Sequence, residues 1–245
     1  MPERPPTGPN DLLRHFEALH GEGEEPWAFS ERGVETLRHA RVAALVGALL
    51  PDARASGAAP RVLELGCSLG LMTGRLAALP AALVAMDLSP TAVRRARARV
   101  PGARFVAGSA TALPVTPRAF DVVVASDGLH SWQLGAADRA AALREIHDAL
   151  VPGGSAVLTE HLRPERFAAF VAEVRASPLR VARVTYLHDR PCYQFEGWLK
   201  AVRHWRVARA LRRSPAVARA LVACGRPFGA AGSRHVCVVA TRGEE

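Results

Sequence analysis

The stretch from Arg61 to Ala77 constrains the fold more than any other part of this 245-residue chain. It starts with the apolar run Val62–Leu65, interrupted only by Glu64, continues through the small-residue turn Gly66–Gly70, and ends with helical spacing. A buried strand, a tight turn and a helix start form an anion-accepting crevice, because the first N–H groups of a helix are unpaired and small residues let a ligand approach the main chain. The stretch therefore predicts a site for a nucleoside-containing cofactor.

Strand and helix patterns alternate after this stretch, which favours an α/β fold with a mostly parallel sheet and helices on both faces. The last two expected strands, 179–186 and 236–241, are separated by a helical insertion at about 187–235. Residues 1–59 are expected to form an N-terminal helical cap or lid ahead of a single domain at 60–245.

The chain carries a net charge of +9, almost all of it from arginine, which invites a nucleic-acid interpretation. A GC-rich coding sequence imposes the same arginine- and alanine-rich bias, so no nucleic-acid partner is expected. No apolar run approaches the length of a membrane span, and the first residues lack the pattern of a signal peptide, so no membrane partner is expected either. Four widely spaced cysteines without a CxxC pattern indicate reduced thiols in a cytoplasmic protein, and no metal is expected. The oligomeric state, monomer or homodimer, stays open.

Polar residues follow the expected strands where a parallel sheet would bring them together. They are Asp87, Ser109 and the pair Ser126–Asp127, next to Glu64 and its turn. The turn does not fit GxGxxG, which makes a nicotinamide or flavin enzyme less favoured. A carboxylate such as Asp87, at the end of the second strand, can accept both hydroxyls of a ribose; the alternative is that it caps the next helix.

Four motifs carry a family resemblance. ELGCSLG, MDLSP, FDVVVASDGLHSW and LVPGGSAVLTE, in this order, resemble the class I S-adenosylmethionine-dependent methyltransferases over about residues 60–160. The resemblance implies a Rossmann-like, seven-stranded, mostly parallel sheet with an antiparallel last strand at Val236–Thr241 and helices on both faces. The N-terminal HFEALHGEGEEPWAF, with GCSLG, further resembles the nodulation-type (NodS-like) N-methyltransferase subgroup.

The resemblance implies S-adenosyl-L-methionine as cofactor and assigns its contacts. Those to the methionine and ribose are Glu64, Gly66, Cys67, Ser68, Gly70 and Asp87; those to the adenine are Leu88, Ser109 and Ala110; and Ser126 closes the site through its backbone. Ser68 stands where a glycine is commoner, and Ser109 stands where the family often has an acidic residue.

Methyl transfer from a sulfonium depends mainly on alignment, and a base matters only for an acceptor that arrives protonated. Asp127 and His130 are the candidates for such a base; alternatively, Asp127 caps a turn and His130 only packs. Four aromatic residues are expected to bind substrate, unless they pack within their own segments: Trp27, Trp132, Tyr193 and Trp198.

The expected function is methylation of an amine or hydroxyl of a small molecule, such as a specialised metabolite or sugar in natural product biosynthesis. Two alternatives stay open: a methyltransferase acting on RNA or protein, and a non-catalytic cofactor-binding scaffold of the same fold.

Overall fold

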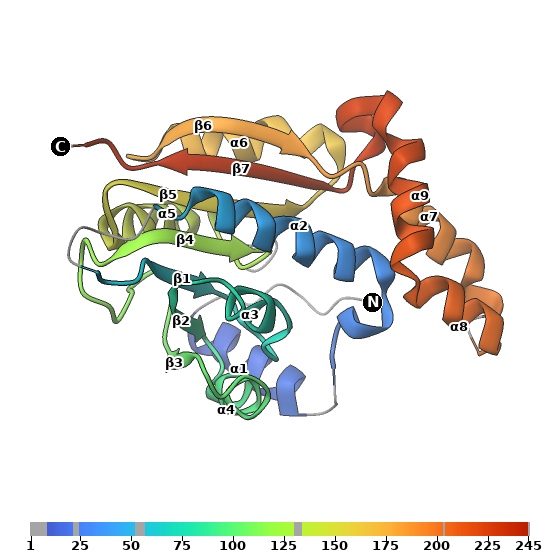
Figure 1. Ribbon diagram of the computed structural model, residues 1–245, viewed down its shortest axis with the longest axis horizontal. Helices are drawn as coiled ribbons and strands as arrows, with labels where there is room; N and C mark the ends of the chain where they lie inside the picture. Colours follow the sequence, from blue (N-terminus) through green and yellow to red (C-terminus); the bar gives the residue numbers. More distant parts are fainter. Residues whose placement is uncertain (1–8, 22–24, 52–56, 130–133, 203, 245) are drawn as a thin grey trace.

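A computed structural model describes residues 9–21, 25–51, 57–129, 134–202 and 204–244. Its centre is a seven-stranded sheet in the order β3-β2-β1-β4-β5-β7-β6 (Figure 1). The strands are β1 (Arg61–Leu65), β2 (Ala82–Asp87), β3 (Arg104–Ala107), β4 (Phe120–Ser126), β5 (Leu150–His161), β6 (Arg180–Tyr186) and β7 (His235–Thr241). Strands β1 to β5 pair in parallel, whereas β7 runs antiparallel to both β5 and β6. The expected Rossmann-like sheet with an antiparallel last strand is confirmed.

The central strands are apolar on both faces because helices cover both faces. In β4, Val122 and Val124 pack on one side with Val42 and Val46, while Val123 faces the other core. A strand buried on both sides needs a continuous apolar run instead of an alternating one. The β-branched run FDVVVA predicts a strand, and the structure places that strand at the centre of the sheet.

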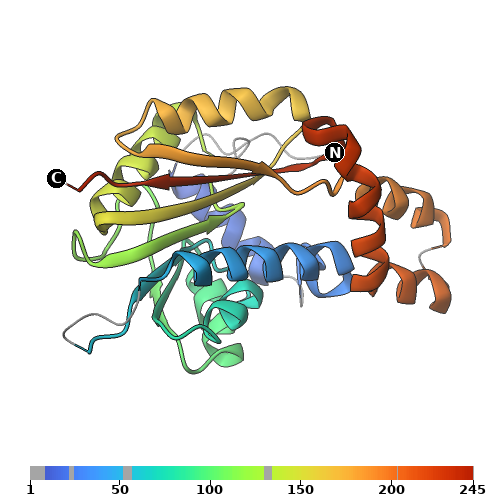
Figure 2. The same cartoon turned by 45° about the horizontal axis from the view of Figure 1, so that its top comes forward.

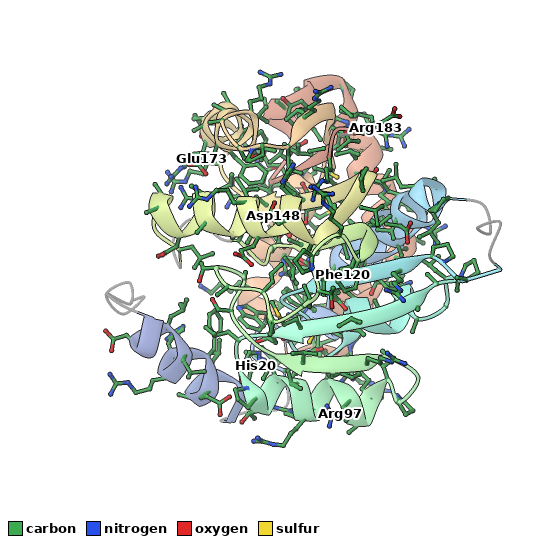
Figure 3. The ribbon with its side chains drawn as sticks, turned by 90° about the vertical axis from the view of Figure 1, so that its left-hand side faces the viewer. His20, Arg97, Phe120, Asp148, Glu173 and Arg183 are labelled. Atoms are coloured by element: carbon green, nitrogen blue, oxygen red, sulfur yellow. The ribbon has the colours of Figure 1, made fainter. Side chains whose placement is uncertain are left out.

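Helices α2 (Gly33–Leu49), α3 (Leu71–Leu76) and α4 (Pro90–Arg99) cover one face, and α5 (Ala136–Ala149) and α6 (Phe167–Arg175) cover the other. The N-terminal α1 (Pro9–Gly21), which carries His20, lies beside α4, which carries Arg97 (Figure 3). Two short 3-10 helices complete this part: η1 (Phe29–Glu31) and η2 (Pro164–Arg166).

The insertion between β6 and β7 is helical. It consists of α7 (Arg190–Trp198), η3 (Leu199–Val202), α8 (Arg206–Arg213), α9 (Pro215–Gly225) and η4 (Arg226–Gly232). In both Figure 1 and Figure 2, α7 and α8 project beyond α9, away from the sheet. Within the described ranges, no helix has both the length and the apolar character needed to cross a membrane.

The observed starts of α4 and α9 agree with the capping residues in the sequence, whereas the start of α2 does not. Ser89 caps α4 and Ser214 caps α9, each ahead of a proline and each accepting a backbone N–H. Ser30 stands just ahead of a run with helical spacing, which predicts that it caps α2, but it lies in η1, where its hydroxyl donates to Glu25. The helix starts at Gly33 instead, and a Cβ there would lie 2.5 Å from the carbonyl oxygen of Ser214. Contact with the insertion therefore fixes the start of α2.

Candidate functional site

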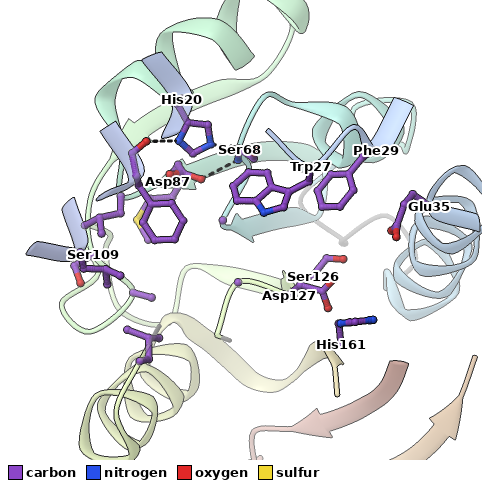
Figure 4. Close-up of a pocket in the computed structure, with 18 of the residues that line it drawn as sticks. His20, Trp27, Phe29, Glu35, Ser68, Asp87, Ser109, Ser126, Asp127 and His161 are labelled. Atoms are coloured by element: carbon purple, nitrogen blue, oxygen red, sulfur yellow. Dashed lines mark hydrogen bonds between the residues drawn. The ribbon is translucent and has the colours of Figure 1, made fainter. Parts of the chain in front are cut away.

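A cavity of about 410 Å³ opens at the carboxyl edge of the sheet. Figure 4 shows it running from Ser109 and Asp87 at one end to Glu35 and His161 at the other, with Trp27 and Phe29 along one side. We call the first end the strand-turn half; its wall contains Gly66, Ser68, Asp87, Leu88, Ser109 and Ala110. We call the second end the aromatic half; its wall contains Trp27, Phe29, Arg32, Glu35, Asp127, His161, Tyr193 and His235.

The turn after β1 is held against the next strand by its backbone. The N–H groups of Gly66 and Cys67 both donate to the carbonyl of Met86, at 2.8 and 2.9 Å. Gly66 has φ of 78°, and a Cβ there would lie 3.1 Å from the Cα of Gly128. A side chain at position 66 would therefore meet both an unfavourable conformation and the loop after β4.

Asp87 ends β2 with its carboxylate fixed in the cavity wall. Oδ2 accepts the N–H of Ser68 at 2.8 Å and Oδ1 accepts the N–H of Ser89 at 2.9 Å. Burial raises the pKa of the Asp87 carboxyl, and the two backbone donors oppose that rise. Each oxygen keeps a further lone pair, so the carboxylate can accept two hydroxyl groups of a ligand.

The strand-turn half also has an apolar part, which we call the slot. Leu88 and Ala110 line it together with Leu12 and Phe16 from α1. The hydroxyl of Ser109 also lies in the wall, 2.8 Å from the hydroxyl of Thr111. A flat heteroaromatic ring with a polar edge fits such a slot.

Three residues expected at the cofactor lie outside the cavity wall. Glu64 and Cys67 are buried, and burial raises the pKa of the Glu64 carboxyl to about 7. Gly70, with φ of 79°, starts α3 where a Cβ would lie 3.2 Å from Ala96 of α4. These residues shape the turn from behind, whereas the other seven expected cofactor residues, including Ser126, line the cavity.

A chain of buried ion pairs underlies the aromatic half. Arg38 of α2 binds Glu35 at 2.8 Å and Asp127 at 3.1 Å. His235 of β7 lies 3.3 Å from the same Asp127 oxygen through Nε2, and its Nδ1 contacts Asp189. The flanking charges raise the pKa of His235 to about 9 despite its burial, so at neutral pH both of its ring nitrogens donate.

The same ion pairs change the expected role of Asp127. Burial alone would raise the pKa of the Asp127 carboxyl, but the positive charges of Arg38 and His235 outweigh burial and lower this pKa. A carboxylate with a lowered pKa is a poor proton acceptor near neutral pH. The geometry therefore favours Asp127 as a fixed negative charge in the wall and not as a base. The other candidate base, His130, lies outside the described residues, as does Trp132.

His161 is a cavity residue that the sequence reasoning missed. Its ring lies 5.0 Å from that of Tyr193 and 4.8 Å from that of His235, between centroids. Its Nε2 is buried, and none of the described groups bonds to it. Burial, with the nearby charge of His235, lowers the pKa of His161 to about 4, so the ring is neutral at pH 7. His161 ends β5, and the strand-end rule that found Asp87 would have found it had it been applied to the fifth strand.

Of the aromatic residues expected to bind substrate, two line the cavity and one does not. Trp27 stacks on Phe29 with ring centroids 5.8 Å apart, and Tyr193 donates its hydroxyl to Glu35 at 2.8 Å; both line the cavity. Trp198 does not: it ends α7 and is 79% exposed. Phe195 and Trp198 are three residues apart, a helical spacing that predicts a shared inward face, but α7 ends at Trp198 and the ring lies in solvent.

Comparison with known proteins finds relatives for the central part of the chain. Residues 62–154 match the family described as methyltransferase domain. A demethylmenaquinone methyltransferase of Chlorobaculum tepidum is 33% identical over 106 residues, which cover 43% of this chain and 42% of that protein. An uncharacterised methyltransferase of Synechocystis is 36% identical over 107 residues, 44% of this chain and 50% of that protein. The matched region thus spans half or less of these relatives.

Solved structures share the fold over more of the chain. The N-methyltransferase NodS from Bradyrhizobium japonicum, in complex with S-adenosyl-L-homocysteine, superposes with a TM-score of 0.61 at 18% identity, covering 96% of this chain and 99% of that one. The [4+2]-cyclase SpnF superposes with a TM-score of 0.59 at 22% identity, covering 84% and 81%. At these identities the likeness concerns the fold alone.

Proposed function

We propose that this protein is an S-adenosylmethionine-dependent methyltransferase whose acceptor is a small molecule bound in the aromatic half of the cavity. The observation that carries the proposal is one continuous cavity, with a backbone turn and a fixed carboxylate at one end and stacked aromatics over buried ion pairs at the other. The match of residues 62–154 to a methyltransferase domain supports it.

The strand-turn half fits S-adenosyl-L-methionine. Asp87 takes the ribose hydroxyls, Gly66 and Ser68 contact the methionine portion, and the slot at Leu88 and Ala110 takes the adenine. Ser109 offers a hydroxyl to the adenine edge, and Ser126 closes the site between the two halves. Glu64, Cys67 and Gly70 support the turn from behind. Helix α1, whose Leu12 and Phe16 line the slot, acts as a lid over it.

When bound, the cofactor supplies a methyl group on a cationic sulfur, which an oxygen or nitrogen nucleophile can attack. Trp27, Phe29 and Tyr193 orient the acceptor and exclude water from it. His161, neutral at pH 7 and with a buried Nε2 that none of the described groups bonds, can hydrogen-bond an acceptor hydroxyl and so orient it. The negative charge of Asp127 stabilises the protonated ring of His235. An amine acceptor that arrives as an ammonium would have to lose its proton before its nitrogen could attack the methyl group.

One observation supports a second candidate function. The cyclase SpnF has this fold, so the fold is not tied to methyl transfer. A protein that binds the cofactor without consuming it is therefore the alternative. Turnover separates the two: only a methyltransferase converts the cofactor to S-adenosyl-L-homocysteine when an acceptor is present.

Calorimetric titration of S-adenosylmethionine tests the site. We expect micromolar binding, roughly −8 kcal/mol. Asp87→Ala should weaken it by about 30-fold or more, because two hydrogen bonds to a charged acceptor are lost. Asp138→Ala, at an exposed carboxylate in α5, is the matched control and should bind normally. Normal binding by folded Asp87→Ala would contradict the ribose assignment. Mass spectrometry of metabolite extracts incubated with methyl-labelled cofactor then identifies the acceptor.

A further inference from the structure

The exposed apolar side chains of this protein gather in one segment. Among the described residues, every large hydrophobic side chain that is exposed lies between β6 and β7: Trp198, Trp205, Val207, Leu211 and Phe228. Trp198 ends α7, Trp205 caps α8, and Val207 lies in the first turn of α8, so these three belong to the tip of the α7–α8 pair. They are 79%, 59% and 68% exposed. Large exposed apolar groups of this kind mark interaction surfaces.

The positive charge of the chain is concentrated in the same segment. Residues 187–235 contain ten arginine and lysine residues against two acidic ones, in a chain whose net charge is +9. On α8, the exposed Arg206 and Arg209 lie three residues apart, which places them along one side. Val207 and Leu211 share the adjacent side, also four residues apart. The exposed part of α8 is therefore basic along one strip and apolar along the next.

Folding does not explain this exposed face, because the inner face of the segment has its own partners. Ala208 is buried, and Glu31 of η1 binds both Arg212 and Arg213. Cys192 of α7 packs in a small core with Ala218 of α9. Helices α7 and α8 lie beyond α9, away from the sheet (Figures 1 and 2), and the side chains of Trp198, Trp205 and Val207 are exposed.

We propose that the α7–α8 tip, comprising Trp198, Trp205, Arg206, Val207 and Arg209, docks on an anionic lipid surface. Tryptophan rings settle at the headgroup level, an aliphatic strip reaches the acyl boundary, and arginines pair with lipid phosphates. This departs from the sequence expectation of no membrane partner, which rested on spanning segments; surface docking needs none. The proposal is independent of the reaction.

Two other occupants fit the tip less well. A nucleic acid would use the arginines and could stack on the tryptophans, but the aliphatic strip of Val207 and Leu211 has no role against phosphates or bases. A second copy of the same face would bring two basic surfaces together, which like-charge repulsion opposes. The lipid surface alone uses the aromatic, aliphatic and basic groups together.

Vesicle co-sedimentation of the full chain tests the proposal. We expect binding to mixed vesicles of phosphatidylcholine and phosphatidylglycerol, little binding to phosphatidylcholine alone, and weaker binding at high salt. Arg206→Glu with Arg209→Glu should reduce the partition coefficient by about tenfold or more, since each basic residue near the surface contributes about 1 kcal/mol. Trp198→Ser with Trp205→Ser should also reduce it severalfold. Matched controls are Phe228→Ser, an exposed apolar residue in η4, and Arg99→Glu with Arg144→Glu, exposed arginines on α4 and α5; these should bind like the wild type.

A measurement on the unmodified protein keeps the test independent of variant folding. Tryptophan emission should shift to the blue on anionic vesicles and be quenched by brominated acyl chains. The proposal is overturned if the wild type shows neither response, or if the control and tip variants lose binding equally. Retention of a random RNA without vesicle binding would assign the tip to nucleic acid. Concentration-dependent self-association, seen by light scattering and abolished in the tryptophan variants, would assign it to a second copy if vesicles do not bind.

Discussion

At the scale of single residues, Glu64 is the most unusual side chain of the sheet. It is the next-to-last residue of β1, 1% exposed, and its Oε2 has no hydrogen-bond partner among the described groups. Burial disfavours the charged form and raises the pKa of this carboxyl from 4.5 to about 7. The folded protein therefore holds a proton at Glu64 in a pH range where the unfolded chain has released it.

This proton makes stability depend on pH. Because the folded pKa is the higher one, the free energy of unfolding should fall as pH rises from about 4.5 to 7 and stay low above that. Glu64→Gln removes the effect, so the variant should gain up to about 3 kcal/mol relative to the wild type between pH 4.5 and pH 8. Urea unfolding of both proteins across this range measures the difference. Glu165→Gln, at an exposed carboxylate in η2, is the control; equal pH dependence in wild type and Glu64→Gln would contradict the prediction.

Residues that end strands could be located from the sequence, and residues from helices could not. Asp87, Ser109 and Ser126 line the cavity because the carboxyl ends of parallel strands share one edge of the sheet. Glu35 and Arg38, which organise the aromatic half, lie inside α2. A helical pattern marks which side is apolar, but it does not tell which buried charge meets which partner from a distant strand.

At the scale of elements, two side chains fasten α1 to α4: Arg95 of α4 donates to the carbonyl of His20 at 2.7 Å, and Glu17 of α1 makes the larger set of contacts. Glu17 accepts hydrogen bonds from the hydroxyl of Ser89 and from the N–H and hydroxyl of Thr91, at the first turn of α4. A carboxylate there also faces the positive end of the helix dipole. Because Phe16 and His20 of α1 line the cavity, this clamp holds part of the cavity wall in place.

Cutting the clamp should loosen α1 without unfolding the domain. In Glu17→Ala, we expect amide hydrogen exchange across α1 to become about tenfold faster, as for loss of about 1–2 kcal/mol of local stability. S-adenosylmethionine affinity should fall severalfold. Arg14→Ala on the same helix removes only the exposed pair with Asp11, so it should change little. Unchanged exchange in Glu17→Ala would show that the other contacts of α1, among them the hydrogen bond from Arg95 to the His20 carbonyl, are enough to hold it.

Helix starts could be predicted from the sequence where capping is local, and could not where a distant contact sets them. Ser-Pro pairs gave the starts of α4 and α9 because capping is a local interaction. The predicted start of α2, with Ser30 as cap, is wrong because Gly33 contacts Ser214, which is distant in sequence. The exposed position of Trp198 depends likewise on where α7 ends, which helical spacing alone does not reveal.

At the scale of the whole molecule, the buried ion pairs tie the N-terminal part to the end of the chain. Arg38 belongs to α2, Asp127 follows β4, Asp189 precedes α7, and His235 opens β7. Tyr193 of the insertion joins them through Glu35. Elements that are distant in sequence thus meet at one cluster directly beneath the aromatic half of the cavity. Its charges should therefore contribute to global unfolding and not to a local opening.

The charge of His235 gives this coupling a measurable pH dependence. Its pKa is raised to about 9 in the folded protein against 6.5 as the ordinary value, so its contribution is complete below pH 6.5 and is lost as pH rises through 9. The free energy of unfolding of the wild type should fall by up to about 3 kcal/mol over this window. His235→Asn should be less stable than the wild type at pH 6, because Asp127 and Asp189 lose their shared cation, yet should lack this decline. Thermal unfolding from pH 6 to pH 10 measures both, with His204→Asn, at an exposed histidine before α8, as control. A decline in His235→Asn as steep as in the wild type would mean that the imidazolium does not hold the cluster together.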